Sequence, residues 1–185
     1  MTINRIPENM PSMFKFMVNI RNQLIKDETL MRLLVYRPEG FSVEDQVDYP
    51  DPLSDLLPNI VDEDSSEYWE IADDKVRKGE KFTNINEEIG CYIYVHEGRD
   101  RPIFGSPCSI EQEVVLSVYI HELFEEDWRM SRIKDRLTAL LVHEIGVAGY
   151  GKLEYLGGDP RDATTGYRRI DYRYEFSTAK KRKYS

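Results

Sequence analysis

Apolar side chains near the start of the chain recur every three or four residues, which is the period of an amphipathic helix. They are Met13, Phe14, Met17, Ile20, Leu24 and Ile25. Pro11 or Ser12 is placed to open this helix, and Asp27 is placed to cap a second, shorter one. The second helix turns three leucines inward, Leu30, Leu33 and Leu34. Pro38 and Gly40 end it, so the pattern predicts two consecutive helices.

The second half of the chain changes to a period of two, which is typical of strands with one buried face. In the stretch 113–127, a strand is predicted with Val115, Ser117, Tyr119 and His121 on one face and Val114, Leu116, Val118 and Ile120 on the other. Over 167–178 an aromatic face carries Ile170, Tyr172, Tyr174 and Phe176, and a charged face carries Arg169, Asp171, Arg173 and Glu175. Further strands are predicted at 91–97 and 151–158. A turn is expected at 98–102, and a linker at 159–166 joins the last two strands.

Between these strands, the sequence from Asp127 to Gly146 predicts a helix capped by Asp127 or Ser131 and ended by Gly146 or Gly149. Its expected buried face holds Met130, Ile133, Leu137, Leu140 and Leu141. Another face carries three arginines at i, i+3 and i+7, namely Arg129, Arg132 and Arg136. These arginines are interpreted either as a docking stripe or as an ordinary solvated helix face.

The order of the elements predicts an α+β fold, a mostly antiparallel sheet with helices packed on one face. We expect one domain over 1–178, with a basic C-terminal tail over 179–185. Residues 41–86 are interpreted as a long acidic loop insertion, with one helical turn near 51–61. Between Arg37 and Lys75 the chain has 13 acidic residues and no Lys or Arg, within a net charge of -9.

Composition limits the remaining possibilities. With 185 residues the chain suits one domain, and no apolar run approaches 18 residues, so no membrane span is expected. The first residues lack the pattern of a secretory signal, and the two cysteines, Cys91 and Cys108, suit a reducing compartment. We therefore expect a cytoplasmic location. An acidic chain without a basic stripe is also a poor candidate for general nucleic-acid binding.

Two His-Glu pairs raise the possibility of a metal-dependent hydrolase. A zincin helix needs a second histidine four residues after the first, but the position four residues after His143 is Val147, beyond the helix-ending Gly146. His121 comes from the predicted strand, with Glu122 on its opposite face. No phosphate-binding glycine loop or nucleophile elbow is present either. We therefore expect no enzyme, catalytic residue, metal or cofactor. A hydrolase using His121 and His143 remains a less favoured alternative.

The final ninety residues resemble bacteriophage tail-terminator and neck proteins, which join head to tail. The resemblance rests on the strand EVVLSVYIHE, the helix RMSRIKDRLTALLVHE, the glycine-rich strand GYGKLEYLGG and the closing strand GYRRIDYRYEF. The amphipathic N-terminal helix also suits that family. The acidic segment 41–86 has no counterpart in its minimal members.

The resemblance implies a virion protein that is made in the host cytoplasm and forms a homo-oligomeric ring, commonly a hexamer. Such a ring would cap the tail tube, meet the head-side connector protein and let DNA pass through its lumen without specific binding. A ring requires that different faces of neighbouring copies meet. The candidate interface residues are Arg129, Arg132, Arg136, Lys180, Lys181, Arg182 and Lys183. An adaptor, stopper or baseplate subunit is the nearest alternative role.

Overall fold

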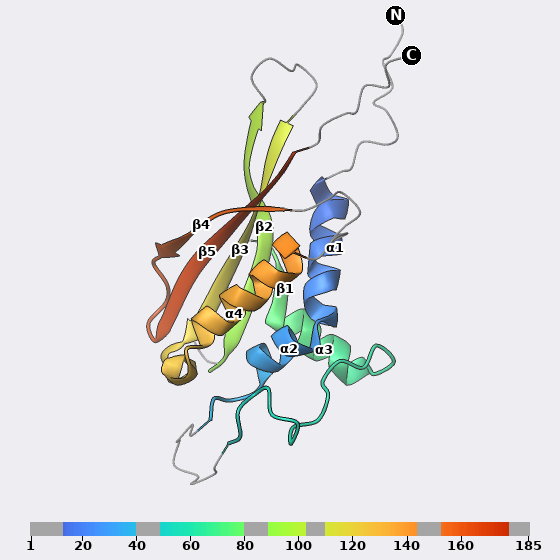
Figure 1. Cartoon of the computed structure of the whole chain (residues 1–185), viewed down its shortest axis with the longest axis vertical. Coiled ribbons are helices and arrows are strands. Elements are labelled where there is room, and N and C mark those ends of the chain that lie inside the picture. The colour runs from blue at the N-terminus through green and yellow to red at the C-terminus, as the bar shows by residue number, and fades with distance from the viewer. Residues whose placement is uncertain (1–12, 40–48, 80–88, 103–109, 144–152, 178–185) are drawn as a thin grey trace, which may run out of the picture.

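The computed structural model describes residues 13–39, 49–79, 89–102, 110–143 and 153–177 (Figure 1). The helices are α1 (Met13–Lys26), α2 (Glu28–Val35), α3 (Ser66–Lys75) and α4 (Arg129–Thr138), with short turns η2 (Glu122–Asp127) and η3 (Ala139–His143) on either side of α4. The strands are β1 (Val76–Lys78), β2 (Cys91–Pro102), β3 (Ile110–His121), β4 (Glu154–Arg161) and β5 (Tyr167–Ser177). Within these ranges, no helix is both long and apolar enough to cross a membrane.

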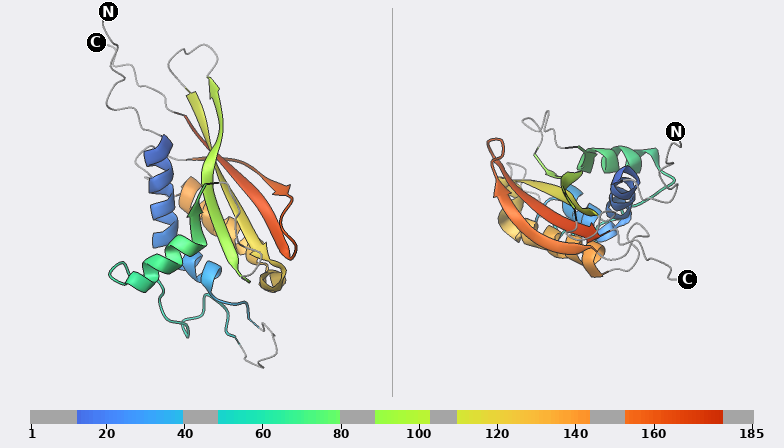
Figure 2. Two further views of the ribbon diagram at one scale, coloured as in Figure 1. Left: turned by 180° about the vertical axis from the view of Figure 1, so that it is seen from behind. Right: turned by 90° about the horizontal axis from the view of Figure 1, so that it is seen from above.

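The strands form one sheet in the order β1-β2-β3-β5-β4. Every neighbouring pair is antiparallel except β1 and β2, which run parallel. Helix α4 lies across one face of the sheet with α1 beside it, and the view from behind shows β3, β5 and β4 without a helix over them (Figure 2). The predicted α+β class, with helices on one face of a mostly antiparallel sheet, is therefore confirmed.

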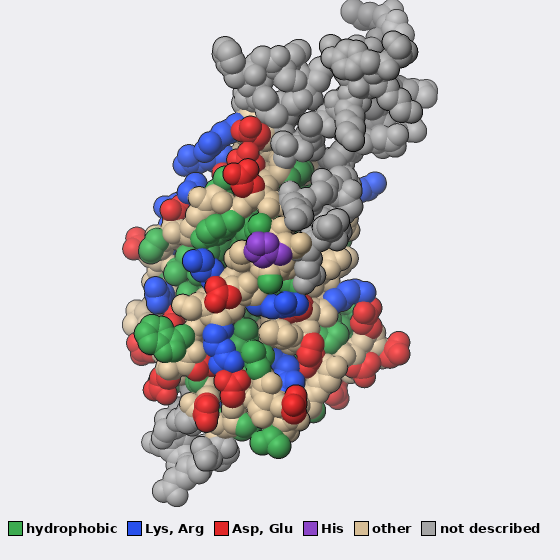
Figure 3. All heavy atoms as spheres, viewed as in Figure 1, with side chains coloured by type: hydrophobic (Ala, Val, Ile, Leu, Met, Phe, Trp, Pro, Cys, Tyr) green, Lys and Arg blue, Asp and Glu red, His purple; other side chains and the backbone are tan. Residues whose placement is uncertain are grey.

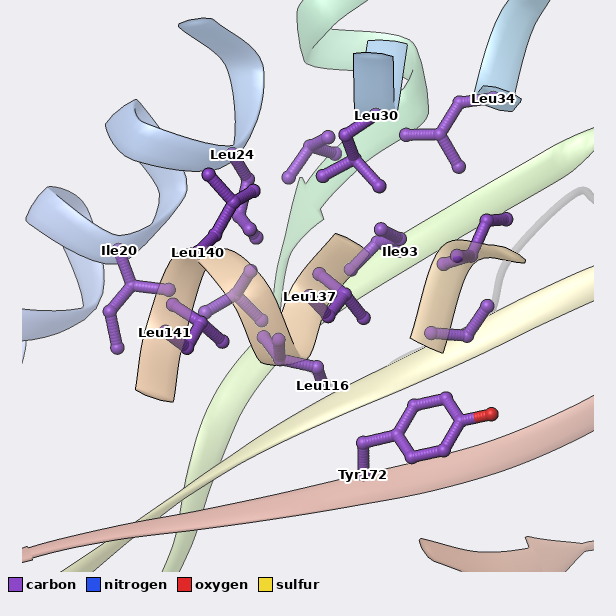
Figure 4. Packing of buried hydrophobic residues seen from close by; sticks show 14 of the residues in the cluster. Ile20, Leu24, Leu30, Leu34, Ile93, Leu116, Leu137, Leu140, Leu141 and Tyr172 are labelled. Carbon is purple, nitrogen blue, oxygen red and sulfur yellow. The ribbon is translucent and has the colours of Figure 1, made fainter. Parts of the chain in front are cut away.

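The period-two patterns separate the two faces of the sheet as predicted, and the structure shows which face is buried. Val114, Leu116, Val118 and Ile120 of β3 belong to the main core, together with Tyr172, Tyr174 and Phe176 of β5. Figure 4 shows Ile20 and Leu24 of α1 and Leu137 of α4 converging on Leu116 and Ile93 of the sheet. Burying such side chains contributes roughly 1.5–3 kcal/mol each relative to exposure, so this layer is the main source of stability.

Helix α1 forms where predicted, but one of its aromatic residues was placed on the wrong face. Phe16 is fully buried and packs against Phe176 with ring centroids 3.7 Å apart, whereas Phe14 is 69% exposed. Asp27 caps α2 as predicted, because its Oδ1 accepts a hydrogen bond from the amide of Leu30 at 2.7 Å.

The acidic segment is not a loop throughout. Ser65 caps α3, and Tyr68 and Ala72 of that helix enter the core. The chain then forms β1, in which Val76 is fully buried opposite Ile93. The stretch 51–61 contains turns and no helix. Neither α3 nor β1 was predicted. Only two residues of α3 are buried in the core and β1 has three residues, so neither leaves a clear period of apolar positions among so many acidic residues.

Strand ends and the long helix also differ from expectation. β2 runs on to Pro102, through the predicted turn at 98–102, with a shift in register between Glu97 and Asp100. β4 continues to Arg161 through part of the predicted linker. α4 ends at Thr138, whose Oγ1 donates to the carbonyl of Lys134 at 2.9 Å, and the backbone widens into the π-helical turn η3. Such a bond back to the preceding turn bends helices.

Candidate functional site

The helix-free face of the sheet carries a network of four polar side chains from β2, β3 and β5. Nε2 of His96 lies 2.9 Å from Oγ of Ser117, and that hydroxyl donates to Oδ1 of Asp171 at 2.7 Å. Nε of Arg169 donates to the same carboxylate oxygen at 2.7 Å. The antiparallel register places Ser117 directly opposite Asp171, which is why residues 54 apart in sequence meet here.

This network resembles a hydrolytic triad only in composition. In a triad, histidine stands between the serine and the acid and takes the serine proton. Here the serine stands between the other two, its proton goes to Asp171, and Ser117 is 1% exposed. Burial would raise the pKa of Asp171, but hydrogen bonds from Arg169 and Ser117 outweigh it and hold that pKa below its usual 3.8. The network therefore ties strands together around an ionised carboxylate and leaves no accessible nucleophile.

Three tyrosines extend this face toward β1. Tyr92, Tyr94 and Tyr119 form a second buried cluster on the opposite side of the sheet from the main core. Cationic side chains lie over them: Nζ of Lys75 is 4.5 Å from the centroid of the Tyr92 ring, and the guanidinium of Arg169 is 5.2 Å from that of Tyr119. Long basic side chains thus cover part of this face, over the tyrosine cluster.

The first predicted interface residue, Arg129, is fully buried. Its guanidinium donates to the carbonyls of Leu33 and Tyr36, the latter at 2.8 Å, and pairs with Asp127 at 2.9 Å. Carbonyls at the end of a helix have no partner within the helix, so Arg129 supplies one for the C-terminus of α2. The prediction that Arg129 is a docking residue on the surface is wrong, and so is the alternative of a solvated arginine.

Arg132 and Arg136 are partly exposed and also bound within the chain. Arg132 donates to both oxygens of Asp51 at 2.8 and 2.9 Å, and Arg136 donates to both oxygens of Asp27. Asp51, which belongs to the acidic segment, thus meets the arginine stripe within one chain. Figure 3, drawn from the helix side, shows basic and acidic side chains interleaved over this surface.

Residues 49–61, which we call the strap, are held against α2 mainly through their backbone. Arg32 donates to the carbonyl of Pro52 at 2.9 Å and to that of Leu57 at 3.2 Å, and it also donates to the carbonyl of Ser54. Glu28 accepts the amides of Ile60 and Val61 at 3.2 and 3.1 Å. Together with Arg132 and Asp51, these contacts fix the strap to the helical layer.

The two histidines of the alternative hydrolase do not share a site. Nδ1 of His121 accepts the amide of Leu123, and its ring packs against Tyr167 at the end of β3. His143 is at the far end of η3, 14 positions after Arg129, which is about 20 Å along the helix at 1.5 Å per residue. In the described ranges, no group of three or more His, Cys, Asp or Glu side chains is placed to hold a metal ion. Lys180, Lys181, Arg182 and Lys183 lie outside the described residues.

Trp128 is a feature that the sequence pattern did not reveal. It is 79% exposed and has a left-handed backbone, with φ 60° and ψ 33°, between η2 and α4. A left-handed backbone at a residue other than glycine costs about 1–2 kcal/mol, so the conformation that holds this indole outward lowers the stability of the folded chain. Beside it a cleft of about 540 Å³ opens between the start of α4 and the β4–β5 hairpin, lined in part by Met130, Tyr155 and Tyr172. The one signal in the sequence that could have indicated this exposed residue is that Trp128 does not belong to the repeating apolar positions of α4.

A groove lies at the opposite edge of the sheet, between α1 and the β1–β2 pair. Its volume is about 410 Å³, and its apolar lining comes from Phe14, Met17, Val18 and Val95. Arg21 beneath it donates to the carbonyl of Val76 at 2.8 Å and pairs with Asp73, which ties α1 to the β1 edge. The exposed Phe14 was predicted to be core, so the groove also could not be found from periodicity.

Comparison with known proteins gives one family. The model of a protein family called YomW matches residues 27–176, a range that begins at the residue capping α2 and ends in β5. No curated protein matches the chain.

Proposed function

Because this chain belongs to the YomW family, a family of phage derivation, we propose that it is a structural subunit of a phage particle that forms a ring at the head–tail junction. In this role it caps the tail tube as a tail terminator or neck protein and contacts the tube protein on one side and the head-side connector on the other. It is made in the host cytoplasm and ends up in the virion. No catalytic step and no cofactor belong to the proposal.

The observation that carries the proposal is the exposure of large apolar side chains at both edges of one sheet. Trp128 is 79% exposed beside β4 and β5, and Phe14 is 69% exposed beside β1 and β2. Exposed aromatic residues next to concave apolar surface favour protein contacts. Because the two features differ and lie at opposite edges, they suit head-to-tail contacts, which close into a ring when the rotation between copies allows.

Charge also supports a channel for DNA. The chain has a formal net charge of -9, and a ring of such subunits repels phosphate unless basic groups line its lumen. A lumen of this kind lets nucleic acid slide without specific binding.

The test is the native mass by light scattering over a wide range of protein concentration, with and without purified tail tubes. We expect a species of several times the 21.8 kDa of one chain, six times for a hexamer, either alone or on tube ends. Antibody labelling of particles would then separate a terminator from an adaptor, stopper or baseplate subunit by its position. A chain that stays monomeric and does not bind tubes would overturn the proposal.

A further inference from the structure

The two exposed apolar features have complementary shapes. At the β4–β5 side, Trp128 projects from the short link between η2 and α4, and its indole is largely in solvent. At the β1–β2 side, the groove between α1 and β2 is hollow and lined by Phe14, Met17 and Val18. We propose that Trp128 of one copy inserts into the α1–β2 groove of the next copy. This inference rests on the ring proposed above and specifies its contact.

The positions of the two features fit a repeating contact. The strand order puts β1 at one edge of the sheet and β4 at the other. Figure 1 shows α4 starting on the side of the β4–β5 hairpin and α1 standing on the opposite side. A projection at one edge and a groove at the other cannot pair with each other within one chain, but they pair between neighbours in a row or ring.

The rims of the two features offer one pairing of opposite charges. The residues before Trp128, Glu122–Asp127, include four carboxylates and no basic group. Asp127 is taken up by Arg129, and Glu125 lies 3.5 Å from Arg168, which leaves Glu122 and Glu126 exposed at the base of the projection. The rim of the groove has one exposed lysine, Lys78, beside the exposed carboxylate of Glu97, so the glutamates of the projection have one cation to meet there. Opposite charges at the rim of an apolar contact favour association and fix its orientation.

Size and backbone strain point the same way. A groove of about 410 Å³ has room for an indole ring, and a tryptophan at the centre of an interface buries roughly 150–250 Å². The left-handed backbone at Trp128 is a conformation that glycine would adopt without strain. Tryptophan at this position therefore lowers the stability of the monomer, which is consistent with a role in a contact between copies.

The experiment uses two full-length variants that each lose one half of the contact. Trp128→Gly removes the projection and keeps the groove, while Phe14→Glu places a charge in the groove and keeps the projection. We expect each variant alone to be monomeric under conditions in which the natural chain forms rings, with or without tail tubes. An equimolar mixture should form a dimer of twice 21.8 kDa and grow no further, because only one intact pair exists between the two variants.

Leu56→Glu is the matched control, because Leu56 is 85% exposed but lines neither feature. It should assemble like the natural chain. Thermal unfolding verifies that all variants are folded, and Trp128→Gly should melt at the natural temperature or above it, because the left-handed strain is relieved.

The outcomes separate this inference from the broader proposal. Rings formed by Trp128→Gly or by Phe14→Glu alone would overturn the contact and leave the ring intact. Monomeric variants whose mixture gives no dimer would also overturn it. A natural chain that never assembles, even on tail tubes, would overturn both.

Discussion

Arg136 of α4 donates two hydrogen bonds to the carboxylate of Asp27, and the same carboxylate caps α2 by accepting the amide of Leu30. One acidic side chain thus starts one helix and binds another. Arg129, two turns earlier on α4, binds the carbonyls at the other end of α2. Helix α2 is therefore held at both termini by arginines of a single helix.

Removal of the Asp27 side chain should lower stability through both contacts. For Asp27→Ala we expect a loss of about 1–3 kcal/mol in the free energy of unfolding, measured by urea denaturation, because a lost cap costs about 0.5–2 kcal/mol and a partly exposed ion pair contributes about 0–1 kcal/mol. Asp27→Asn keeps an oxygen for the cap and should lose less. Asp64→Ala, at an exposed position, is the control. Equal losses for Asn and Ala would show that the cap contributes nothing.

The three arginines of α4 should differ in their contributions according to burial. Arg129→Met leaves Asp127 and two helix carbonyls without their partner in a fully buried place, so we expect a loss of about 3–5 kcal/mol. Arg132→Met removes a pair whose arginine side chain is 25% exposed, and the expected loss is about 1 kcal/mol or less. Urea denaturation of the two variants decides the order. A larger effect at position 132 would contradict the assignment of Arg129 as the internal anchor.

Stability should fall in acid partly through Asp171. Its pKa in the folded chain is below the usual value, so its contribution is fully present above pH 3.8 and is lost as the pH falls through the folded value. The natural chain should therefore exceed Asp171→Asn in free energy of unfolding at pH 7, and the gap should shrink as the pH falls below 3.8. Chemical denaturation at a series of pH values measures it. A gap that stays constant or widens in acid would contradict the ionised network.

Cys91 should be chemically silent in the folded protein. Burial raises the pKa of its thiol to about 12, and the side chain is fully buried against the core. A Cys108→Ser chain isolates this thiol, which should react with a thiol reagent at pH 8 only at the rate of global unfolding. Adding denaturant should restore the reaction. Rapid labelling of the native chain would mean that β2 opens locally.

The sequence predicted those parts of the fold whose signal is local. β5 alternates charged and apolar residues from Arg169 to Phe176, β3 is an apolar run long enough for a strand, and Asp27 stands just before the apolar positions of α2, so these local signals were sufficient. α3 and β1 were not predicted because only Tyr68 and Ala72 of α3 are buried and β1 has only three residues, so neither shows a clear apolar period. Tertiary packing, not periodicity, stabilises both.

The candidate site was less predictable, because its partners are distant in sequence. Asp51 is 81 residues from Arg132, and Asp27 is 109 residues from Arg136. The spacing of the arginines showed that they share a helix face and could not show what that face meets. The solvent exposure of Phe14 and Trp128 could not be predicted either. Both are apolar residue types, and only the packing of the folded chain shows that their side chains point into solvent.

The strap has a consequence for how this protein can diverge. Arg32 and Glu28 form hydrogen bonds with backbone carbonyls and amides of the strap. Every residue type has these backbone groups, except that proline lacks the amide N–H. Substitutions at the exposed positions of the strap, such as Asp55 and Leu56, therefore leave these contacts in place. Pro52 and Val61, by contrast, also pack inward, and a proline at 60 or 61 would remove an amide whose hydrogen bond Glu28 accepts. The course of the strap is thus encoded less in its own side chains than in Glu28 and Arg32, four positions apart on α2.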